Sequence, residues 1–286
     1  MSTPTTGGRS LSKSVAVGLL LGAAFLLSVL IYKELFMVLA AAAAGFGAWE
    51  LSTALRIKGW YVPRVPSVIG AVLIMPATFF GGAKAQWLIS LATVAALIIW
   101  RAAHVLWERR QAPMQAFRNT VRDFAASAFV VIYLPLMTSF AILLLRRPTD
   151  GAIWVIAFVV TVSMIDTAGY LVGRKLGKHQ MAPGVSPKKS IEGLIASIVA
   201  GSTSSVLFIV YGLHGQWWQG IIFAAVMLLA AVFGDLAESL IKRDLGVKDM
   251  SSLLPGHGGV MDRMDSILPA ALIAYLFASI FFPIAQ

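Results

Sequence analysis

The chain has 286 residues, of which 58% are hydrophobic and 13% are charged, and its mean hydropathy is +0.82. A soluble domain carries about a quarter charged residues, so this composition excludes an ordinary soluble protein and indicates an integral membrane protein. The net charge of +10 gives no reason to expect a nucleic-acid partner, because Lys and Arg also orient membrane proteins, and the absence of Cys excludes disulfides and thiolate chemistry.

Apolar segments long enough to cross a bilayer predict an all-α, polytopic fold with about nine transmembrane helices. The predicted spans are residues 14–32, 35–55, 66–81, 85–106, 124–145, 151–173, 193–213, 218–241 and 266–284. The third span is short. The first has an apolar core longer than that of a signal peptide, which is about 7–15 residues. Both segments are kept as spans.

Basic residues predict the orientation, because Lys and Arg close to span ends resist translocation. With these spans, most of the 23 basic residues fall on one side. The N-terminus is therefore predicted to be cytoplasmic, the C-terminus outside, and the membrane to be the cell membrane. Residues 1–12 are predicted to be a disordered cytoplasmic tail, 13–150 the N-terminal transmembrane helices and 151–286 a C-terminal transmembrane catalytic region.

A polar stripe occurs in the sixth span, where Asp166, Gly169, Tyr170 and Gly173 recur at helical spacing. The glycines, with Gly177 after them, allow another helix backbone to approach closely, as small residues do in membranes. For the glycines we favour this packing role over ligand contact. For Asp166, helix packing and ligand contact remain equally open.

The segment GVSPKKSIEG, residues 184–193, follows this span and places two adjacent ammonium groups, Lys188 and Lys189, before an apolar helix. Pro187 argues against ladder structure, so a loop is predicted, with a helix beginning near Ser190. Helix starts and lysines both attract phosphate, which suggests an anion clamp. The alternative is that the lysines serve only membrane orientation.

At the end of the eighth span, the segment GDLAESLIKRD carries Asp235, Glu238, Ser239 and Lys242 on one helical face. A carboxylate within a span is costly, at least about 2.5–3.5 kcal/mol, so such residues usually face a cavity, a partner or an ion. The alternative is that the helix has already left the bilayer and the face is solvated.

The segment LPGHGGVMDRMDS, residues 254–266, combines glycines with ionisable groups before the last span. The glycines allow a sharp bend and bring backbone N–H groups close to a ligand. Asp262 and Asp265 are three positions apart, so on a helix they point the same way, with Arg263 between them. His257 is expected to form a hydrogen bond or contact phosphate, because no second His or Cys stands at zinc spacing.

Carboxylates and basic groups are interleaved in this part of the chain, since Asp235 and Asp249 join Asp262 and Asp265. The basic residues among them are Lys242, Arg243, Lys248 and Arg263. Carboxylates so close together require a cation, and hard oxygen ligands suit Mg²⁺. Lys and Arg suit phosphate. The combination predicts metal-assisted phosphoryl or nucleotidyl transfer at the membrane surface.

The run SLIKRDLGVKDMSSLLPGHGGVMDRMD, residues 239–265, resembles the signature of the phosphatidate cytidylyltransferases, or CDP-diacylglycerol synthases. The matching positions are Ser239, Lys242, Arg243, Lys248, Asp249, Ser251, Leu254, Pro255, His257, Gly258, Gly259, Asp262, Arg263 and Asp265. The segments DTAGYLVGRKLGK, SPKKSIEG and GDLAES also resemble the family in content and order. Before residue 150 only the span number and Glu50 match, so no site is assigned there.

This resemblance implies an enzyme of phospholipid biosynthesis, usually a homodimer, that joins CTP and phosphatidate into CDP-diacylglycerol and pyrophosphate with Mg²⁺. It leaves open a K⁺ ion beside the Mg²⁺. The residues expected to hold metal are Asp235 and Asp262, with Asp249 and Asp265 as second candidates. Catalytic roles are assigned to Asp235, Asp262, Lys248, Arg263 and His257. Substrate-binding roles are assigned to Ser186, Lys188, Lys189, Ser239, Lys242, Arg243, Asp166 and Tyr170.

Other classes of protein also accommodate nine spans that contain carboxylates. A transporter or channel does not explain so many phosphate-binding residue types in the cytoplasmic loops, and no pair of matching broken helices is apparent. Another lipid nucleotidyltransferase or a CTP-dependent lipid kinase is the nearer alternative. The CDP-alcohol phosphotransferases are disfavoured because their DGxxAR pattern is missing.

Overall fold

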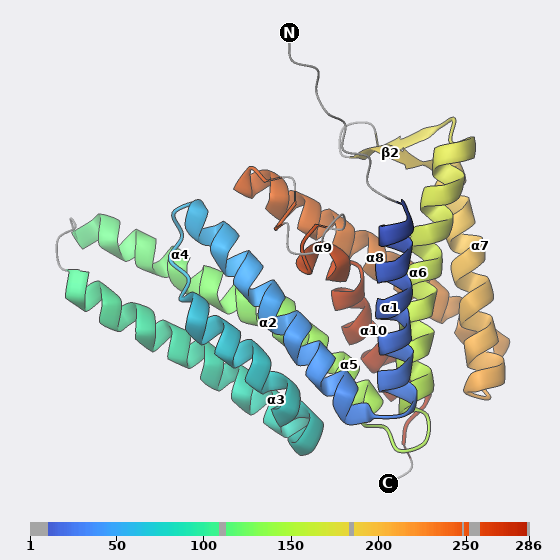
Figure 1. The fold of residues 1–286 in the computed structure, drawn as a ribbon, viewed down its shortest axis with the longest axis horizontal. Helices are drawn as coiled ribbons and strands as arrows, with labels where there is room; N and C mark the ends of the chain where they lie inside the picture. Colours follow the sequence, from blue (N-terminus) through green and yellow to red (C-terminus); the bar gives the residue numbers. More distant parts are fainter. Residues whose placement is uncertain (1–10, 109–112, 183–185, 248, 252–257, 285–286) are drawn as a thin grey trace.

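The computed structural model describes residues 11–108, 113–182, 186–247, 249–251 and 258–284, and it is built from helices with one short β hairpin (Figure 1). The elements are α1 (Leu11–Leu30), α2 (Lys33–Ile57), α3 (Arg64–Glu108), α4 (Pro113–Val131), η1 (Ile132–Leu136), α5 (Met137–Leu145), α6 (Gly151–Leu176), β1 (Gln180–Ala182), β2 (Ser186–Ser190), α7 (Ile191–Leu207), η2 (Phe208–Gly212), α8 (Trp217–Leu245), α9 (Met261–Met264) and α10 (Ile267–Phe281). The predicted tail, residues 1–12, lies outside the described residues except for Leu11 and Ser12, where α1 begins.

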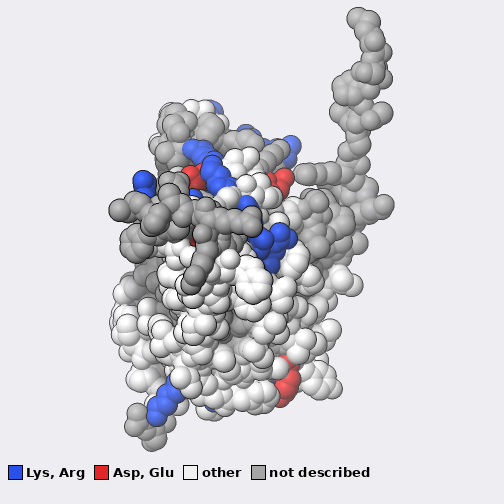
Figure 2. All heavy atoms as spheres, turned by 90° about the vertical axis from the view of Figure 1, so that its left-hand side faces the viewer, with Lys and Arg blue, Asp and Glu red and all other residues white. Residues whose placement is uncertain are grey.

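Within the described residues, seven helices are long and apolar enough to cross a membrane, which is the architecture of a polytopic membrane protein. On the face shown in Figure 2, charged side chains gather at the upper end, a few lie at the lower end, and the surface between is largely uncharged. This pattern matches a bilayer-spanning body with polar ends. The exact number of crossings and the orientation of the N-terminus stay predictions.

The helix α3 contains both the third and the fourth predicted spans, because the chain folds back at Gly82, where φ is +70°. Gly70 in the first arm lies so close to Thr93 in the second that a Cβ at Gly70 would overlap the threonine side chain. The two arms therefore pack antiparallel (Figure 1). Counting them separately raises the seven candidate helices to eight, and the separation predicted between residues 81 and 85 is confirmed.

The fifth predicted span is one continuous rod of α4, η1 and α5, in which η1 is a π-helical turn that contains Pro135. Proline has no N–H to donate to the carbonyl four residues earlier, and a π-turn accommodates the missing bond. The rod keeps its direction, and α5 is almost entirely buried against α10, α3 and α6.

The loop predicted over residues 184–189 is wrong in one respect, because Ser186–Ser190 forms the strand β2. It pairs antiparallel with β1, and the register shifts between Gln180 and Ala182. A two-stranded sheet has only edge strands, so the missing N–H of Pro187 does not interrupt an interior ladder. The prediction that the next helix begins near Ser190 is confirmed: Ser190 is the N-cap of α7, and its hydroxyl accepts a hydrogen bond from the Gly193 N–H at 3.1 Å.

Two buried clusters hold the bundle together. One joins α5, α6, α8 and α10, with Trp154, Phe158 and Phe223 fully buried at its centre. The other joins α2, α3 and α4 and reaches the start of α9 at Met261. Because the second cluster includes residues from both ends of the chain, α2 lies against the segment that carries the predicted catalytic aspartates.

Candidate active site

A cavity of about 580 Å³ lies between α6, α7, α8 and the α9–α10 segment. Its described lining includes four carboxylates and a guanidinium, contributed by Asp166, Asp235, Asp262, Asp265 and Arg263. Tyr170 and the polar residues Ser190, Ser197 and Ser266 complete the polar part of the lining. The cavity therefore brings together aspartates that are separated by as many as 99 positions in the sequence.

Close backbone contacts place Asp235 beside Asp265. At Gly234, just before Asp235, a Cβ would collide with the carbonyl oxygen of Asp265 and would touch Pro269. Only glycine allows α8 to approach the α9–α10 junction this closely. This close approach therefore requires the glycine of GDLAES, a requirement that no local pattern in the sequence predicted.

The glycine stripe of α6 packs against α7 as predicted. A Cβ at Gly193 would lie 2.8 Å from the Gly169 carbonyl oxygen and 3.2 Å from the Gly173 Cα. The Ser197 hydroxyl donates a 2.7 Å hydrogen bond to the Ile165 carbonyl across the same interface. Asp166 is exposed and lines the cavity beside this interface, and its ligand contact stays a prediction.

The carboxylate of Asp262 is held by the backbone around it. Its Oδ2 accepts hydrogen bonds from the N–H of Gly259 at 2.7 Å and from the N–H of Met250 at 3.0 Å. Its Oδ1 faces the Lys242 ammonium group at 3.1 Å. Gly258 has φ +82°, a conformation that favours glycine, and it directly precedes the Gly259 N–H that Asp262 accepts.

The burial of Glu238 shows whether the polar face of α8 is solvated. Its side chain is only 1% exposed, and one oxygen pairs with Lys242 at 2.9 Å. The other oxygen, Oε1, is buried and has no hydrogen-bond partner among the described residues. A buried and incompletely paired carboxylate beside Asp262 excludes the solvated alternative and is typical of a site that receives a cation or a proton.

Glu50 reaches this region from α2 and was not assigned a role from sequence. Its side chain is 4% exposed, and it accepts hydrogen bonds from the backbone N–H of Val260 and Met261 and from the Ser251 hydroxyl. Two sequence signals pointed to it: it is an isolated acid within an apolar span, and it matches the family in a part of the chain where little else does.

The predicted site residues divide into three groups. The cavity unites Asp166, Tyr170, Asp235, Asp262, Arg263 and Asp265, and Lys242 joins them through Asp262. Ser239, Arg243 and Asp249 are not among the described residues that line the cavity, and their roles stay predictions. Lys248, His257 and the side chains of Ser186, Lys188 and Lys189 lie outside what the structure describes.

The cavity suits a hard divalent cation. Within the described part of the chain, no three His, Asp or Glu side chains are close enough to hold a metal ion by themselves. Mg²⁺ does not require such a cage, since it keeps several waters and is usually held by one or two carboxylates together with substrate phosphates. Asp235 and Asp262, which line the same cavity, are donors of that kind.

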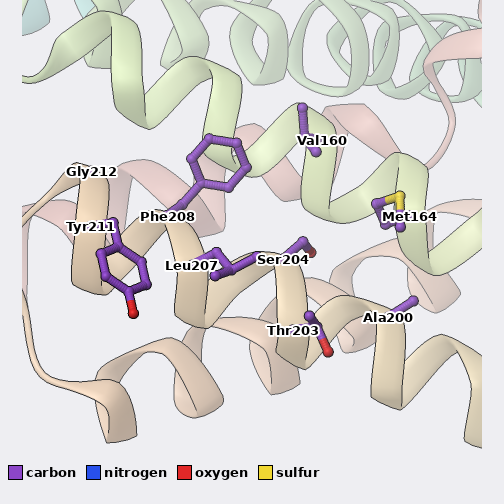
Figure 3. Close-up of a pocket in the computed structure, with 9 residues that line it drawn as sticks. All are labelled: Val160, Met164, Ala200, Thr203, Ser204, Leu207, Phe208, Tyr211 and Gly212. Carbon is purple, nitrogen blue, oxygen red and sulfur yellow. The ribbon is translucent and has the colours of Figure 1, made fainter.

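A second hollow, of about 760 Å³, lies on α6, α7 and η2 and is shown in Figure 3. Val160 and Met164 contribute from α6, whereas Leu207, Phe208 and Tyr211 contribute from the α7–η2 rod. Its described lining holds no Asp, Glu, Lys or Arg. The groove is therefore apolar and is unsuited to a polyphosphate. The acidic cavity, which carries the ionisable groups, is the candidate active site.

Fold and cavity together define a polytopic membrane protein with a cavity lined by carboxylates and a guanidinium. A model of the cytidylyltransferase family matches residues 12–281, and the chain belongs to that family. It is similar to the phosphatidate cytidylyltransferase of Mycobacterium leprae, with 36% identity over 282 residues that cover 96% of this chain and 89% of the relative.

Two further relatives carry the same enzyme name. The phosphatidate cytidylyltransferase of Mycobacterium bovis is 34% identical over 273 residues, which cover 94% of this chain and 88% of the relative. Phosphatidate cytidylyltransferase 4, chloroplastic, of Arabidopsis thaliana is 30% identical over 300 residues, which cover 93% of this chain and 73% of the relative. The resemblance found in the sequence and the predicted class of enzyme are confirmed, which argues against a transporter.

Proposed function

We propose that this protein transfers the cytidylyl group of CTP to phosphatidate, forming CDP-diacylglycerol and pyrophosphate, with Mg²⁺ as cofactor and at the cytoplasmic face of the cell membrane. The observation that supports this most directly is the single cavity in which Asp235, Asp262, Asp265 and Arg263 meet. The names of the relatives suggest the substrates, and the charges in the cavity suggest the chemistry.

The reaction requires little acid–base help. The phosphate monoester of phosphatidate has a second pKa of about 6, so it arrives largely as a dianion. One of its oxygens attacks the α-phosphorus of CTP, the bond from that phosphorus to the bridging oxygen breaks, and pyrophosphate leaves. The barrier comes mainly from the mutual repulsion of two polyanions and from their alignment.

In this proposal the side chains around the cavity reduce the repulsion between the two substrates and align them. In this proposal Asp235 and Asp262 hold Mg²⁺, and Asp265 lies beside them. The bound ion would neutralise charge on the reacting phosphates. Arg263 lines the cavity and Lys242 lies 3.1 Å from Asp262, so both can pair with phosphate oxygens.

Several parts of the proposal rest on the family resemblance alone. Lys188 and Lys189 of β2 would bind one of the anionic substrates. A K⁺ ion beside Mg²⁺ and a homodimeric assembly belong to the same set of expectations.

A reconstituted reaction tests the proposal. The purified protein in liposomes that contain phosphatidate should release pyrophosphate when CTP and Mg²⁺ are present, and release should stop when Mg²⁺ is omitted and resume when it is restored. Parallel reactions with dCTP and ATP measure nucleotide preference. Flux of a solute without CTP-dependent pyrophosphate release would refute the proposal and would favour a carrier.

A further inference from the structure

Glu50 is a buried carboxylate that the proposed chemistry does not use. It lies in the C-terminal half of α2 and is 4% exposed, in a helix apolar enough to span the membrane. Burial of a carboxylate is unfavourable unless hydrogen bonds or charges compensate it. The identity of its partners therefore indicates what this side chain is for.

All of its hydrogen bonds that the structure gives come from the segment around the predicted catalytic aspartates. The N–H of Val260 donates to Oε1 at 3.0 Å, the N–H of Met261 donates to Oε2 at 2.9 Å, and the Ser251 hydroxyl donates to Oε1. These donors are separated from Glu50 by 201 to 211 positions in the sequence. Each carboxylate oxygen thus fixes a different backbone N–H.

The N–H just before these two, that of Gly259, is bonded to Asp262 instead of Glu50. Gly259 donates its N–H to Asp262 Oδ2 at 2.7 Å, so three consecutive N–H groups, from residues 259 to 261, are divided between two carboxylates. Asp262 directly follows the two N–H groups that Glu50 holds. A displacement of that backbone would move Asp262 relative to the cavity.

Gly259 shows how closely the two parts approach. A Cβ at this position would lie 2.7 Å from Glu50 Oε2 and 2.9 Å from Oε1. A side chain there would push the carboxylate away. Gly259 is therefore required for this contact, as Gly258 before it is required for the turn.

We propose that Glu50 is a positioning residue of the active site: it clamps the backbone before Asp262 so that this aspartate faces the cavity and can hold Mg²⁺. This proposal rests on the proposed function, because its first test measures turnover of CTP and phosphatidate. Glu50 would add to the site a residue from the N-terminal transmembrane helices. It would act on the metal through Asp262 rather than by direct contact.

The test uses Glu50→Gln, which keeps the shape of the side chain but replaces one oxygen with an NH₂ group that opposes an N–H donor. Loss of support for a metal ligand typically costs about 10–100-fold in metal affinity or activity. The concentration of Mg²⁺ that gives half-maximal turnover should rise by that factor, and KM for CTP and phosphatidate at saturating Mg²⁺ should change little.

Asp123→Asn provides the matched control. Asp123 is another buried carboxylate of the N-terminal helices, 1% exposed and paired with Arg101 at 2.8 Å, and it forms no part of the candidate site. Its substitution should lower thermal stability and leave the Mg²⁺ dependence unchanged. A purely structural role for Glu50 would give Glu50→Gln the same behaviour.

Amide hydrogen exchange gives a readout that does not depend on activity. The amide protons of residues 258–266 should exchange faster in Glu50→Gln than in the wild type. Their exchange rates in Asp123→Asn should equal those of the wild type. If the wild type fails to make CDP-diacylglycerol, the proposed function is refuted and the exchange data still decide the role of Glu50. Wild-type Mg²⁺ dependence together with wild-type exchange in Glu50→Gln would overturn the inference.

Two milder variants keep the test decisive if Glu50→Gln does not fold. Ser251→Ala removes only the hydroxyl donor and should raise the Mg²⁺ requirement by a few-fold, whereas Gly259→Ala crowds the Glu50 carboxylate and should reproduce the full shift. An unchanged Mg²⁺ requirement in both folded variants would refute the clamp.

Discussion

At the scale of single residues, Asp262 combines two properties that are usually in conflict. Its Oδ2 is fixed by two backbone N–H groups, which orients the carboxylate, and its side chain is only 6% exposed. It nevertheless lines the cavity, where Oδ1 meets Lys242. An oriented, largely desolvated carboxylate interacts strongly with a cation, because little solvent screens it.

Asp262→Asn should therefore abolish turnover, with a loss of at least about 100-fold, and leave the protein folded and inserted. Asparagine keeps a carbonyl oxygen that can accept the N–H bonds but removes the charge that would bind Mg²⁺. Turnover in liposomes and the thermal unfolding temperature in detergent measure the two effects.

Asp244→Asn is the control for this prediction, since Asp244 is an exposed residue in the last turn of α8. It should retain wild-type turnover. Near-normal turnover in Asp262→Asn would contradict the assignment of Asp262 to the metal.

At the scale of elements, hydropathy predicted most of the fold because a bilayer imposes length and polarity on each helix. The fold-back within α3 was correctly divided at residues 81–85, where Gly82 takes φ +70°. The strand β2 was missed because the rule against Pro187 in a sheet applies to interior ladders, and β2 has none. Local sequence does not reveal which strand a segment will pair with.

The α6–α7 interface yields a prediction at the same scale. Gly193→Ala places a Cβ 2.8 Å from the Gly169 carbonyl, so the helices must separate. Such overpacking costs about 1–3 kcal/mol, and turnover should fall as well because Gly193 lines the cavity. Unfolding in denaturant measures the first effect.

Gly22→Ala is the comparison for that variant, because a Cβ at Gly22 would meet nothing within 4 Å. It should be neutral in both stability and turnover. Equal stability of Gly193→Ala and the wild type would show that α6 and α7 do not pack as closely as described.

At the scale of the whole molecule, the predicted division into residues 13–150 and 151–286 does not separate the site from the rest. Glu50 on α2 bonds to Val260 and Met261, and Met261 belongs to the buried cluster of α2, α3 and α4. The sequence could identify the acids near the C-terminus because they share helix faces and loops. Glu50 matched the family, but the sequence could not assign it a role, because its contact spans more than 200 positions and has no local pattern.

The orientation of the protein gives a further test, since the chain has no native Cys. Lys178 and Thr149 are exposed residues beyond opposite ends of α6, a helix of 26 residues that is about 39 Å long. A membrane-impermeant maleimide added outside intact cells should label Thr149→Cys and should reach Lys178→Cys only after the cells are opened. Labelling of Lys178→Cys in intact cells would place the candidate active site on the outer face.

The most direct test of the central claim follows the phosphorus atoms of CTP. With phosphatidate vesicles and Mg²⁺, label at the α-phosphate should enter the lipid extract as CDP-diacylglycerol, and label at the γ-phosphate should remain in water-soluble pyrophosphate. Transfer of the γ-label to lipid would show a CTP-dependent lipid kinase. Absence of both labels from the lipid would contradict nucleotidyl transfer by this cavity.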